Sequence, residues 1–413
     1  MSSNGTSPIL RFSEFTCEYK IYKLGQITEI KSASRVLREQ WQDSGVPFFR
    51  SSDVVAAHKM EKNKKVYIAQ ELFEELSSKS GRLKKNDLLV TGGGSIGIPY
   101  LVKSDEPLYF KDADLICFKS NKTIYGPYLY QFFLSPTFRQ YLRKITHTGT
   151  ISHFTIEQGK ATPIRLPATL EQKKIAEFLC KVDKKISLLK EKHALLEQYK
   201  KGVMQKLFKQ EIRFKDNSGN EFPDWQSRRF EEVFVRITRK NKEDNQNVLT
   251  ISAQMGLVNQ EKYFNKSVSA KDLTGYYLLE NGDFAYNKSY SKGYPMGAIK
   301  RLNNYDKGVV STLYICFRVV GEQEPLFWEQ FFEAGLLNRE INKIAQEGAR
   351  NHGLLNVSVT EFFNDIEVPV PSRAEQRKIA DFLCVLDKKL NSVKEQIELT
   401  QTFKKGLLQQ MFV

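Results

Sequence analysis

The sequence predicts an α+β fold in which two similar mixed α/β domains are separated by two long helices, with an internal pseudo-two-fold repeat. Three observations lead to this prediction. One helical segment occurs twice, each copy follows a region of short β-type runs, and those two regions match each other in outline. Because equivalent sequences fold alike, the two halves are expected to share one scaffold.

The repeated segment covers residues 166–208 and 370–412, which align without a gap and are identical at nearly half of their positions. In both copies apolar residues recur every three or four positions, which predicts an amphipathic helix with a coiled-coil seam. A lone seam would face water, so each helix needs a partner, and the simplest partner is the other copy. The predicted seam residues are Ile175, Leu179, Val182, Ile186, Leu189, Leu196, Ile379, Leu383, Leu386, Leu390, Val393 and Ile397.

The helix starts are marked by Pro167 and Pro371, which are expected to end the preceding strands. Thr169…Gln172 and Ser372…Glu375 match the capping-box pattern, in which two side chains satisfy free backbone N–H groups. The resulting boundaries are 1–165 for the first domain with an N-terminal arm, 166–212 for the central helix, 213–369 for the second domain and 370–413 for the C-terminal helix.

Each globular domain shows short β-type runs broken by Gly, Asn, Asp and Pro, and one helical pattern. A helix is predicted over Pro127–Ile145, with its counterpart over Pro325–Gln346. The predicted strands are Val46–Phe49, Leu88–Thr91 and Leu115–Phe118 in the first domain, and Phe284–Tyr286, Val309–Ser311 and Leu313–Phe317 in the second.

Charge favours a polyanionic partner, because the 413 residues carry a net charge of +15. The charge is uneven. Residues 1–209 hold 35 Lys and Arg against 21 Asp and Glu, whereas residues 210–413 hold 28 against 27. Bulk charge therefore supports nucleic-acid binding in the first half, and the second half must rely on local clusters such as Arg236, Arg239, Lys240 and Lys242.

Composition also indicates the compartment. The five cysteines form no CxxC pair, which fits a reducing cytosol. No N-terminal apolar run resembles a signal peptide, and no stretch approaches the ~20 apolar residues of a membrane span. The expected location is therefore cytoplasmic, without a membrane partner.

The loops of the two domains supply the candidate binding residues. Gly92–Gly97 formally matches GxGxxG, but Ile98-Pro99-Tyr100 predicts a strand or turn where a cofactor site needs a helix. A glycine loop near a phosphate backbone and an ordinary exposed hairpin both stay open, and Arg50 could either contact a guanine or pair with Asp53. The candidate DNA-binding residues are Arg50, Ser51, Ser52, Gly93, Ser95, Thr148, Thr150, Ser152, His153, Lys240, Asn287, Lys288, Ser289, Tyr290, Lys292, Arg350, Asn351 and His352.

Neither a catalytic motif nor a metal-ligand set is recognisable in the sequence. The pair Gly159-Lys160 lacks the glycine of a GxxxxGK[ST] phosphate loop, and the five histidines are scattered. We therefore expect a non-catalytic chain without its own cofactor. A coiled-coil scaffold that binds only proteins and a stand-alone DNA-modifying enzyme are the alternatives.

The arrangement resembles the specificity subunits of type I restriction–modification systems over nearly the whole chain. The resemblance rests on the paired helix openings Pro167–Leu179 and Pro371–Leu383, on Arg213-Phe214 with Phe222–Trp225, and on Gly45–Arg50.

The resemblance implies two target-recognition domains, each reading one half of a bipartite, asymmetric site in double-stranded DNA. The two helices would pack as an antiparallel coiled coil and set the spacer between the half-sites. Methyltransferase subunits would supply adenine-N6 methylation with S-adenosylmethionine. Restriction subunits would supply ATP-driven cleavage with Mg²⁺.

Overall fold

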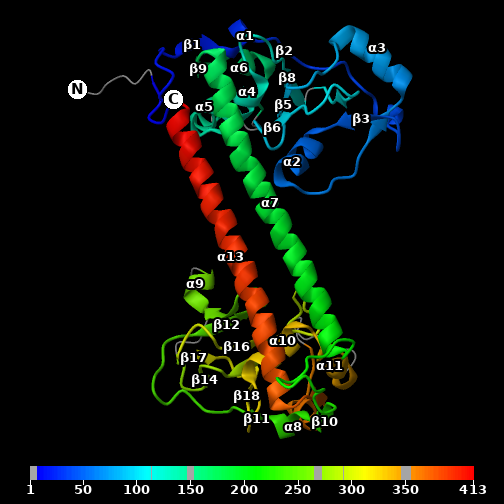
Figure 1. Cartoon of the computed structure of the whole chain (residues 1–413), viewed down its shortest axis with the longest axis vertical. Helices are drawn as coiled ribbons and strands as arrows, with labels where there is room; N and C mark the ends of the chain where they lie inside the picture. Colours follow the sequence, from blue (N-terminus) through cyan, green and yellow to red (C-terminus); the bar gives the residue numbers. More distant parts are fainter. Residues whose placement is uncertain (1–6, 113, 147–152, 265–271, 292, 346–354) are drawn as a thin grey trace, which may run out of the picture. The chain divides into compact units, whose positions relative to one another are not determined.

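The computed structural model describes residues 7–112, 114–146, 153–264, 272–291, 293–345 and 355–413. It contains two compact units: unit 1 combines Met1–Glu191 with Lys394–Val413, and unit 2 is Lys192–Val393. The long helices α7 (Thr169–Phe208) and α13 (Arg373–Met411) each contribute to both units (Figure 1). Each unit thus joins a mixed α/β domain to the start of one long helix and the end of the other, and the predicted fold class is confirmed.

The globular part of unit 1 contains three small sheets, with strand orders β1–β9, β2–β8–β5–β6 and β4–β3–β7, among the described residues. Its strands are β1 (Lys20–Lys23), β2 (Ile30–Lys31), β3 (Val46–Phe49), β4 (Tyr67–Ile68), β5 (Leu88–Thr91), β6 (Pro99–Leu101), β7 (Tyr109–Phe110), β8 (Leu115–Phe118) and β9 (Pro163–Leu166). Its helices are α1 (Leu24–Ile27), the 3₁₀ turn η1 (Arg38–Gln40), α2 (Ser51–Lys59), α3 (Gln70–Ser80), α4 (Gly126–Leu134), α5 (Pro136–Thr146) and α6 (Ile156–Ala161).

Unit 2 repeats this plan with strand orders β10–β19, β11–β18–β15–β16, β12–β13 and β14–β17. Its strands are β10 (Gln226–Arg229), β11 (Phe234–Arg236), β12 (Leu249–Ser252), β13 (Gly256–Asn259), β14 (Tyr277–Glu280), β15 (Phe284–Asn287), β16 (Ala298–Arg301), β17 (Lys307–Val310), β18 (Ile315–Val319) and β19 (Glu367–Val370). Its helices are α8 (Phe230–Val233), α9 (Gln260–Phe264), α10 (Pro325–Glu333), α11 (Asn338–Ile344) and α12 (Val359–Asn364).

The central four-stranded sheets of the two units are equivalent. Both are antiparallel, and β2–β8–β5–β6 matches β11–β18–β15–β16 in order. Strands β3, β5, β8 and β15 occur where the sequence predicts them, while β17 and β18 are displaced by about two residues from the predicted runs. Alternation and turn residues therefore locate these strands well and their ends less well.

The prediction of one uninterrupted helix after the central sheet is wrong in both units. In unit 1 the chain breaks between α4 and α5 at Ser135, whose ψ of 153° is extended. The next residue, Pro136, sterically disfavours a helical conformation at Ser135. In unit 2 the break between α10 and α11 contains Gly335, whose φ of +71° ends the first helix. Both units therefore have two short helices joined by a turn, although a different residue produces the turn in each unit.

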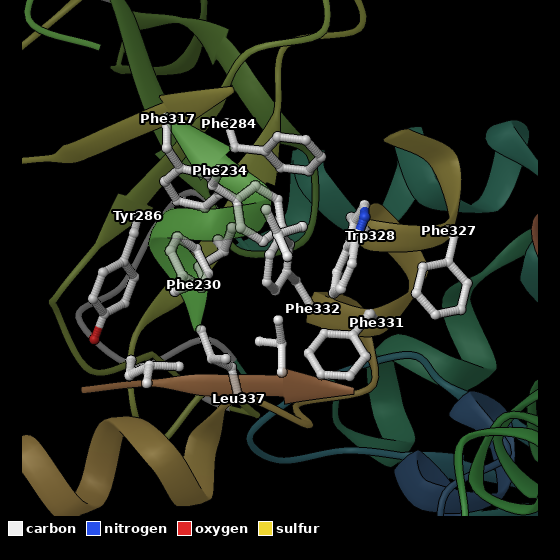
Figure 2. Packing of buried hydrophobic residues seen from close by; sticks show 14 of the residues in the cluster. Phe230, Phe234, Phe284, Tyr286, Phe317, Phe327, Trp328, Phe331, Phe332 and Leu337 are labelled. Atoms are coloured by element: carbon white, nitrogen blue, oxygen red, sulfur yellow. The ribbon is translucent and has the colours of Figure 1, made fainter. Parts of the chain in front are cut away.

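Each unit buries the last turns of the long helix that begins in the other unit. The core of unit 1 includes Leu407, Leu408 and Met411 of α13, with Phe412 against Tyr128 at a ring distance of 5.1 Å. The core of unit 2 includes Met204, Leu207 and Phe208 of α7. Figure 2 shows the aromatic side chains of this second core, among them Phe230, Phe234, Phe317, Phe332 and Trp328, which come from strands and helices on both sides of the cluster.

The two long helices run antiparallel within each unit, as the resemblance implied. In unit 1, Lys404 Nζ lies 2.6 Å from Asp183, while Ile175 and Leu179 share the core with Met411. In unit 2, Lys200 Nζ lies 2.5 Å from Asp387. These two pairs are repeat mates, because Asp183 aligns with Asp387 and Lys200 aligns with Lys404.

The predicted seam is partly buried. Seven of its residues are buried, Ile175, Leu179, Ile186, Ile379, Leu383, Leu386 and Val393, whereas Val182, Leu189, Leu196, Leu390 and Ile397 are intermediate. Most of the buried residues pack into the globular cores rather than only against the other helix. The heptad pattern therefore reflects packing of each helix against a globular core as well as packing of the two helices against each other.

The capping boxes predicted at the helix starts are not formed. Glu171 and Glu375 are buried and accept an arginine and one further donor each. Arg11 and Tyr19 bind Glu171 at 2.7–2.9 Å. Arg213 and Trp225 bind Glu375 at 2.8–3.0 Å. The neighbouring Gln172 and Gln376 bind backbone groups of the strand–helix connections. Only half of one box exists, since Ser372 accepts the N–H of Glu375.

In unit 1 the N-terminal arm lies against the end of α13. In unit 2 the equivalent two segments are joined in one continuous stretch of chain. Leu10 N donates to Gln410 O at 3.1 Å, and Ile212 N donates to Lys206 O at 3.4 Å. Gln410 aligns with Lys206 in the repeat, and Leu10 aligns with Ile212. The N-terminal arm therefore packs on the end of α13 in the same way that residues 210–214 pack on the end of α7.

Candidate nucleic-acid interface

In unit 1, three of the predicted binding segments meet around Asp114, which directly precedes β8 and lies beside the end of β5. Ser51 Oγ, at the start of α2, donates to Asp114 O at 3.0 Å, and Gly92 N donates to the same oxygen at 2.8 Å. A Cβ added at Gly93 would lie 3.7 Å from Asp114 Oδ1 and 3.8 Å from His153 Nδ1. The structure thus brings together Ser51, the glycine loop and His153, which were predicted from separate parts of the sequence.

The glycine loop of unit 1 connects β5 to β6, and no helix starts there. The prediction that Ile98–Tyr100 continues as a strand or turn is confirmed. Gly94 and Ser95 are exposed at the tip. Gly97 holds the loop against α5, because its φ is +71° and a Cβ would lie 2.6 Å from Leu142 Cδ2. The loop is therefore anchored at its base and presents small, polar atoms at its tip.

Arg50 adopts the local pairing that the sequence left open. Its guanidinium binds the Asp53 carboxylate at 2.8 Å and donates to Lys64 O at 2.7 Å. It also lies over the Trp41 ring, 5.7 Å from the centroid. Ser52 is exposed and accepts an N–H from Asn63 at 3.2 Å. Arg50 contributes charge to this surface, but its fork is already occupied.

In unit 2 the equivalent place is the loop after β15, and its residues differ. Asn287 Oδ1 accepts the N–H of Ser289 at 3.0 Å, and Tyr290 is 60% exposed. Lys288 O accepts the N–H of Leu355 at 3.0 Å, as Gly92 O accepts that of Phe154 at 2.8 Å. A backbone hydrogen bond therefore connects each loop to the segment that precedes α6 or α12, whereas the side chains offered in unit 2 are amide, hydroxyl and phenol instead of glycine.

Lys240 occupies a separate position. Its Nζ donates to Gly275 O at 2.7 Å and lies 4.4 Å from the centre of the Tyr277 ring. Its neighbour Arg239 pairs with Glu280 at 3.1 Å and with Asp283 at 3.5 Å. In the local cluster expected to bind phosphate in the second half, Arg239 is thus neutralised by acidic neighbours and Lys240 is held by a carbonyl oxygen.

Seven predicted binding residues lie outside the described part of the chain. They are Thr148, Thr150, Ser152, Lys292, Arg350, Asn351 and His352. The described residues that flank them, His153 and Leu355, adjoin the glycine loop and the Lys288 loop, respectively.

Buried carboxylates lie at the starts of β5 and β15, at the opposite ends of these strands from the two loops, and the sequence assigned them no role. Asp87 and Asp283 are equivalent, and each accepts a backbone N–H three residues earlier, at 2.8 Å and 2.7 Å. Asp87 pairs with Lys119 at 2.6 Å and Asp283 with Arg318 at 2.5 Å. Burial raises the pKa of Asp283, against the opposing effect of Arg318. The signal was available, because both aspartates occur at matching positions of the repeat.

Across the described ranges, His, Cys, Asp and Glu form no group of three or more able to hold a metal ion. No described helix combines the length and apolarity that a membrane crossing requires.

Comparison with known proteins identifies the family. The model of the type I restriction modification DNA specificity domain matches residues 17–198 and again residues 223–401. This chain therefore belongs to that family, with one copy of the domain in each half. A Haemophilus influenzae protein described as a type I restriction enzyme specificity subunit is 28% identical over 166 residues, about 40% of each chain.

Solved structures support the same fold. The S subunit of a type I restriction–modification system from M. genitalium matches with a TM-score of 0.59 and 16% identity, over 98% of this chain and 99% of that one. A chain from a study of assembly and conformational transition of the type I system matches with a TM-score of 0.52 and 13% identity, over 96% and 97%. At these identities the likeness establishes the fold.

Proposed function

We propose that this chain is the DNA-recognition subunit of a type I restriction–modification complex. Each unit reads one half of a bipartite, asymmetric site in double-stranded DNA. One observation carries the proposal: equivalent sheet ends of two like scaffolds present different loops, glycine-rich after β5 and Asn-Lys-Ser-Tyr after β15. Because bases are read by the donors and acceptors offered to them, different loops on one scaffold select different short sequences.

The helix pair sets the distance between the half-sites in this proposal. Helices α7 and α13 have 40 and 39 residues, and each contributes to both units. At about 1.5 Å per residue such a helix is about 60 Å long, a length that spans well over one turn of B-DNA. Removing whole heptads from both helices should therefore shorten the spacer without changing the half-sites.

The chemistry belongs to partner subunits in this proposal. Methyltransferase subunits carry S-adenosylmethionine and methylate adenine N6, and restriction subunits use ATP and Mg²⁺ for translocation and cleavage. This chain selects the DNA site. It acts in the cytoplasm and carries no cofactor of its own. The family membership favours this assignment over a protein-binding scaffold or a stand-alone enzyme.

Mapping N6-methyladenine across the genome of the source strain, with and without this chain, tests the proposal. Loss of one bipartite, asymmetric motif is the expected result, and it would give both half-sites at once. Unchanged methylation, with the partner genes expressed, would refute the recognition role. Loss of a short continuous motif would keep DNA recognition and refute the two-unit arrangement.

A further inference from the structure

A basic groove lies beside the glycine loop of unit 1. It is a cavity of about 750 Å³ between α5, the last turns of α13 and the end of α2. Five of its lining residues carry basic groups, and none of the lining residues is acidic. These are His58, Arg139, Arg143, Lys404 and Lys405. Lys404 is held by Asp183, whereas Lys405 is exposed and forms no ion pair with a described residue.

The groove is continuous with the candidate interface. Ile96 of the glycine loop lines it, and Arg139 Nη1 donates to Ile96 O at 3.4 Å. Gly97 packs against Leu142 of α5, which lines the same groove. A nucleic-acid strand in contact with the loop tip would therefore lie directly beside several basic side chains.

Unit 2 has a counterpart of this groove with a different charge. It is a cavity of about 700 Å³ lined by Lys200 and Lys201, which align with Lys404 and Lys405. Here every lining cation except Lys201 faces a carboxylate. Lys300 pairs with Glu333, Arg301 pairs with Glu329 at 3.2 Å, and Lys200 pairs with Asp387 at 2.5 Å. The second groove is close to neutral.

We propose that the groove between α5 and α13 in unit 1 binds the sugar–phosphate backbone of the DNA beside the half-site that unit 1 reads. This proposal rests on the proposed function and adds a sequence-independent anchor to it. Arginine and lysine side chains supply the charge that phosphates need. The apolar lining residues, which include Leu142 and Leu408, suit the deoxyribose rings between the phosphates.

Charge and position favour nucleic acid over an acidic protein segment as the occupant. The groove adjoins the loop that carries base-reading atoms, and the first half of the chain holds the excess of 14 positive charges, 35 minus 21. A protein partner that bound the two repeats alike would require two similar grooves. The two grooves differ in charge. The molecule that binds the groove of unit 1 must therefore distinguish the two units, as an asymmetric DNA site does.

The test compares Lys405→Gln with Lys201→Gln in the full chain. The two lysines are repeat mates, both are exposed, and the charge around them differs. Binding to a duplex that carries the mapped site and to a scrambled duplex would be measured by fluorescence anisotropy at several salt concentrations. A double variant, Arg143→Gln with Lys405→Gln, extends the series, and far-ultraviolet circular dichroism verifies folding.

Each phosphate contact contributes about 0.9 to the slope of log K against log salt. We therefore expect the slope to fall by about 0.9 for Lys405→Gln and by about 1.8 for the double variant, on both duplexes. The ratio of affinities for the two duplexes should not change, and Lys201→Gln should behave as the wild type.

An unchanged slope in the double variant would overturn the proposal, as would a loss confined to the mapped site. A normal slope with weaker assembly onto the methyltransferase subunit would also overturn it and identify the groove as a protein-binding surface. Failure of the proposed function looks different: the wild-type chain would then bind both duplexes equally, whatever the slope of the variants.

Discussion

The two units differ in their exposed loops and agree in their buried and half-buried polar pairs. Glu171 and Glu375, Asp87 and Asp283, and Asp183 and Asp387 occupy equivalent places and bind equivalent partners. The loops after β5 and β15 and the charges of the two grooves differ. The comparison separates residues that maintain the scaffold from residues that are free to determine what each unit binds.

The largest expected effect comes from removing the buried carboxylates. The Glu375 side chain is 0% exposed, and Glu375→Ala would remove the carboxylate that accepts hydrogen bonds from Arg213 and Trp225. Breaking a buried ion pair from one side costs about 3–5 kcal/mol. We expect Glu171→Ala to destabilise unit 1 by a similar amount, because Arg11 and Tyr19 lose the same support.

Urea unfolding followed by amide hydrogen exchange would assign each loss to its unit. Exposed Glu395→Ala is a suitable control, since it also removes a carboxylate from α13. The equivalence of the units would fail if one buried substitution were silent and the other severe.

The loops after β5 and β15 each offer a matched pair of glycine substitutions. Gly97 and Gly94 have φ values of +71° and +68°, but only at Gly97 would a Cβ meet a neighbour. Gly297 and Gly293 repeat this contrast in unit 2, where a Cβ on Gly297 would lie 2.2 Å from Asn287 O. Replacement by alanine costs about 1 kcal/mol for the positive φ alone, and about 2–3 kcal/mol where a clash adds to it.

Thermal unfolding would give these costs, and DNA affinity would show whether the loops matter for recognition. Gly97→Ala and Gly297→Ala should each weaken binding to one half-site only. If Gly94→Ala were as damaging as Gly97→Ala, the tight packing against α5 would not be what positions the loop.

The aspartate–lysine pairs between the helices should contribute less. Asp183 accepts Lys404 and Gln131, as Asp387 accepts Lys200 and Gln330. Because these carboxylates are about one-third exposed, Asp183→Asn and Asp387→Asn should each cost about 1 kcal/mol. Denaturant midpoints of the two variants and of the double variant would show whether the pairs are independent. A strongly non-additive double variant would mean that the two units do not unfold separately.

The sequence predicted what repeats and alternates, and it failed where one residue changes the local geometry. The doubled helix, the strands β3, β5 and β8 and the mixed α/β class follow from periodicity. The turn at Ser135 depends on Pro136, and the turn at Gly335 depends on a positive φ, so a single helical pattern concealed both. Periodicity also could not tell burial against the domain from burial against the other helix.

The candidate site residues were chosen by residue type and loop position, and their contacts could not be predicted from the sequence. Ser51, Gly93 and His153 were named from separate loops, and only the structure places them around Asp114. The pairing of Arg50 with Asp53 needed the position of α2 to be decided. Glu171 was assigned no role because its partner, Arg11, lies 160 residues away, a distance no local pattern spans.

The smallest expected effect concerns His58, in the basic groove of unit 1. Partial burial lowers its pKa from the ordinary value of 6.5, and Arg139, Lys404 and Lys190 lower it further against the opposing charge of Asp183. Because the unfolded chain then binds the proton more readily, His58 reduces the stability of unit 1 as the pH falls through 6.5 toward the lowered value. The groove of unit 2 has no histidine among its lining residues, so unit 2 should lack this dependence.

Bound phosphate would reverse the sign for DNA binding. Its negative charge offsets the cations around His58 and raises the pKa of the imidazole, so binding takes up a proton and strengthens as the pH falls from about 7.5 to about 6. His58→Gln should remove this increment while leaving the affinity at pH 7.5 almost unchanged. If the variant kept the full pH dependence, the phosphate would not lie near His58, and the asymmetry between the grooves would have to serve something other than the DNA backbone.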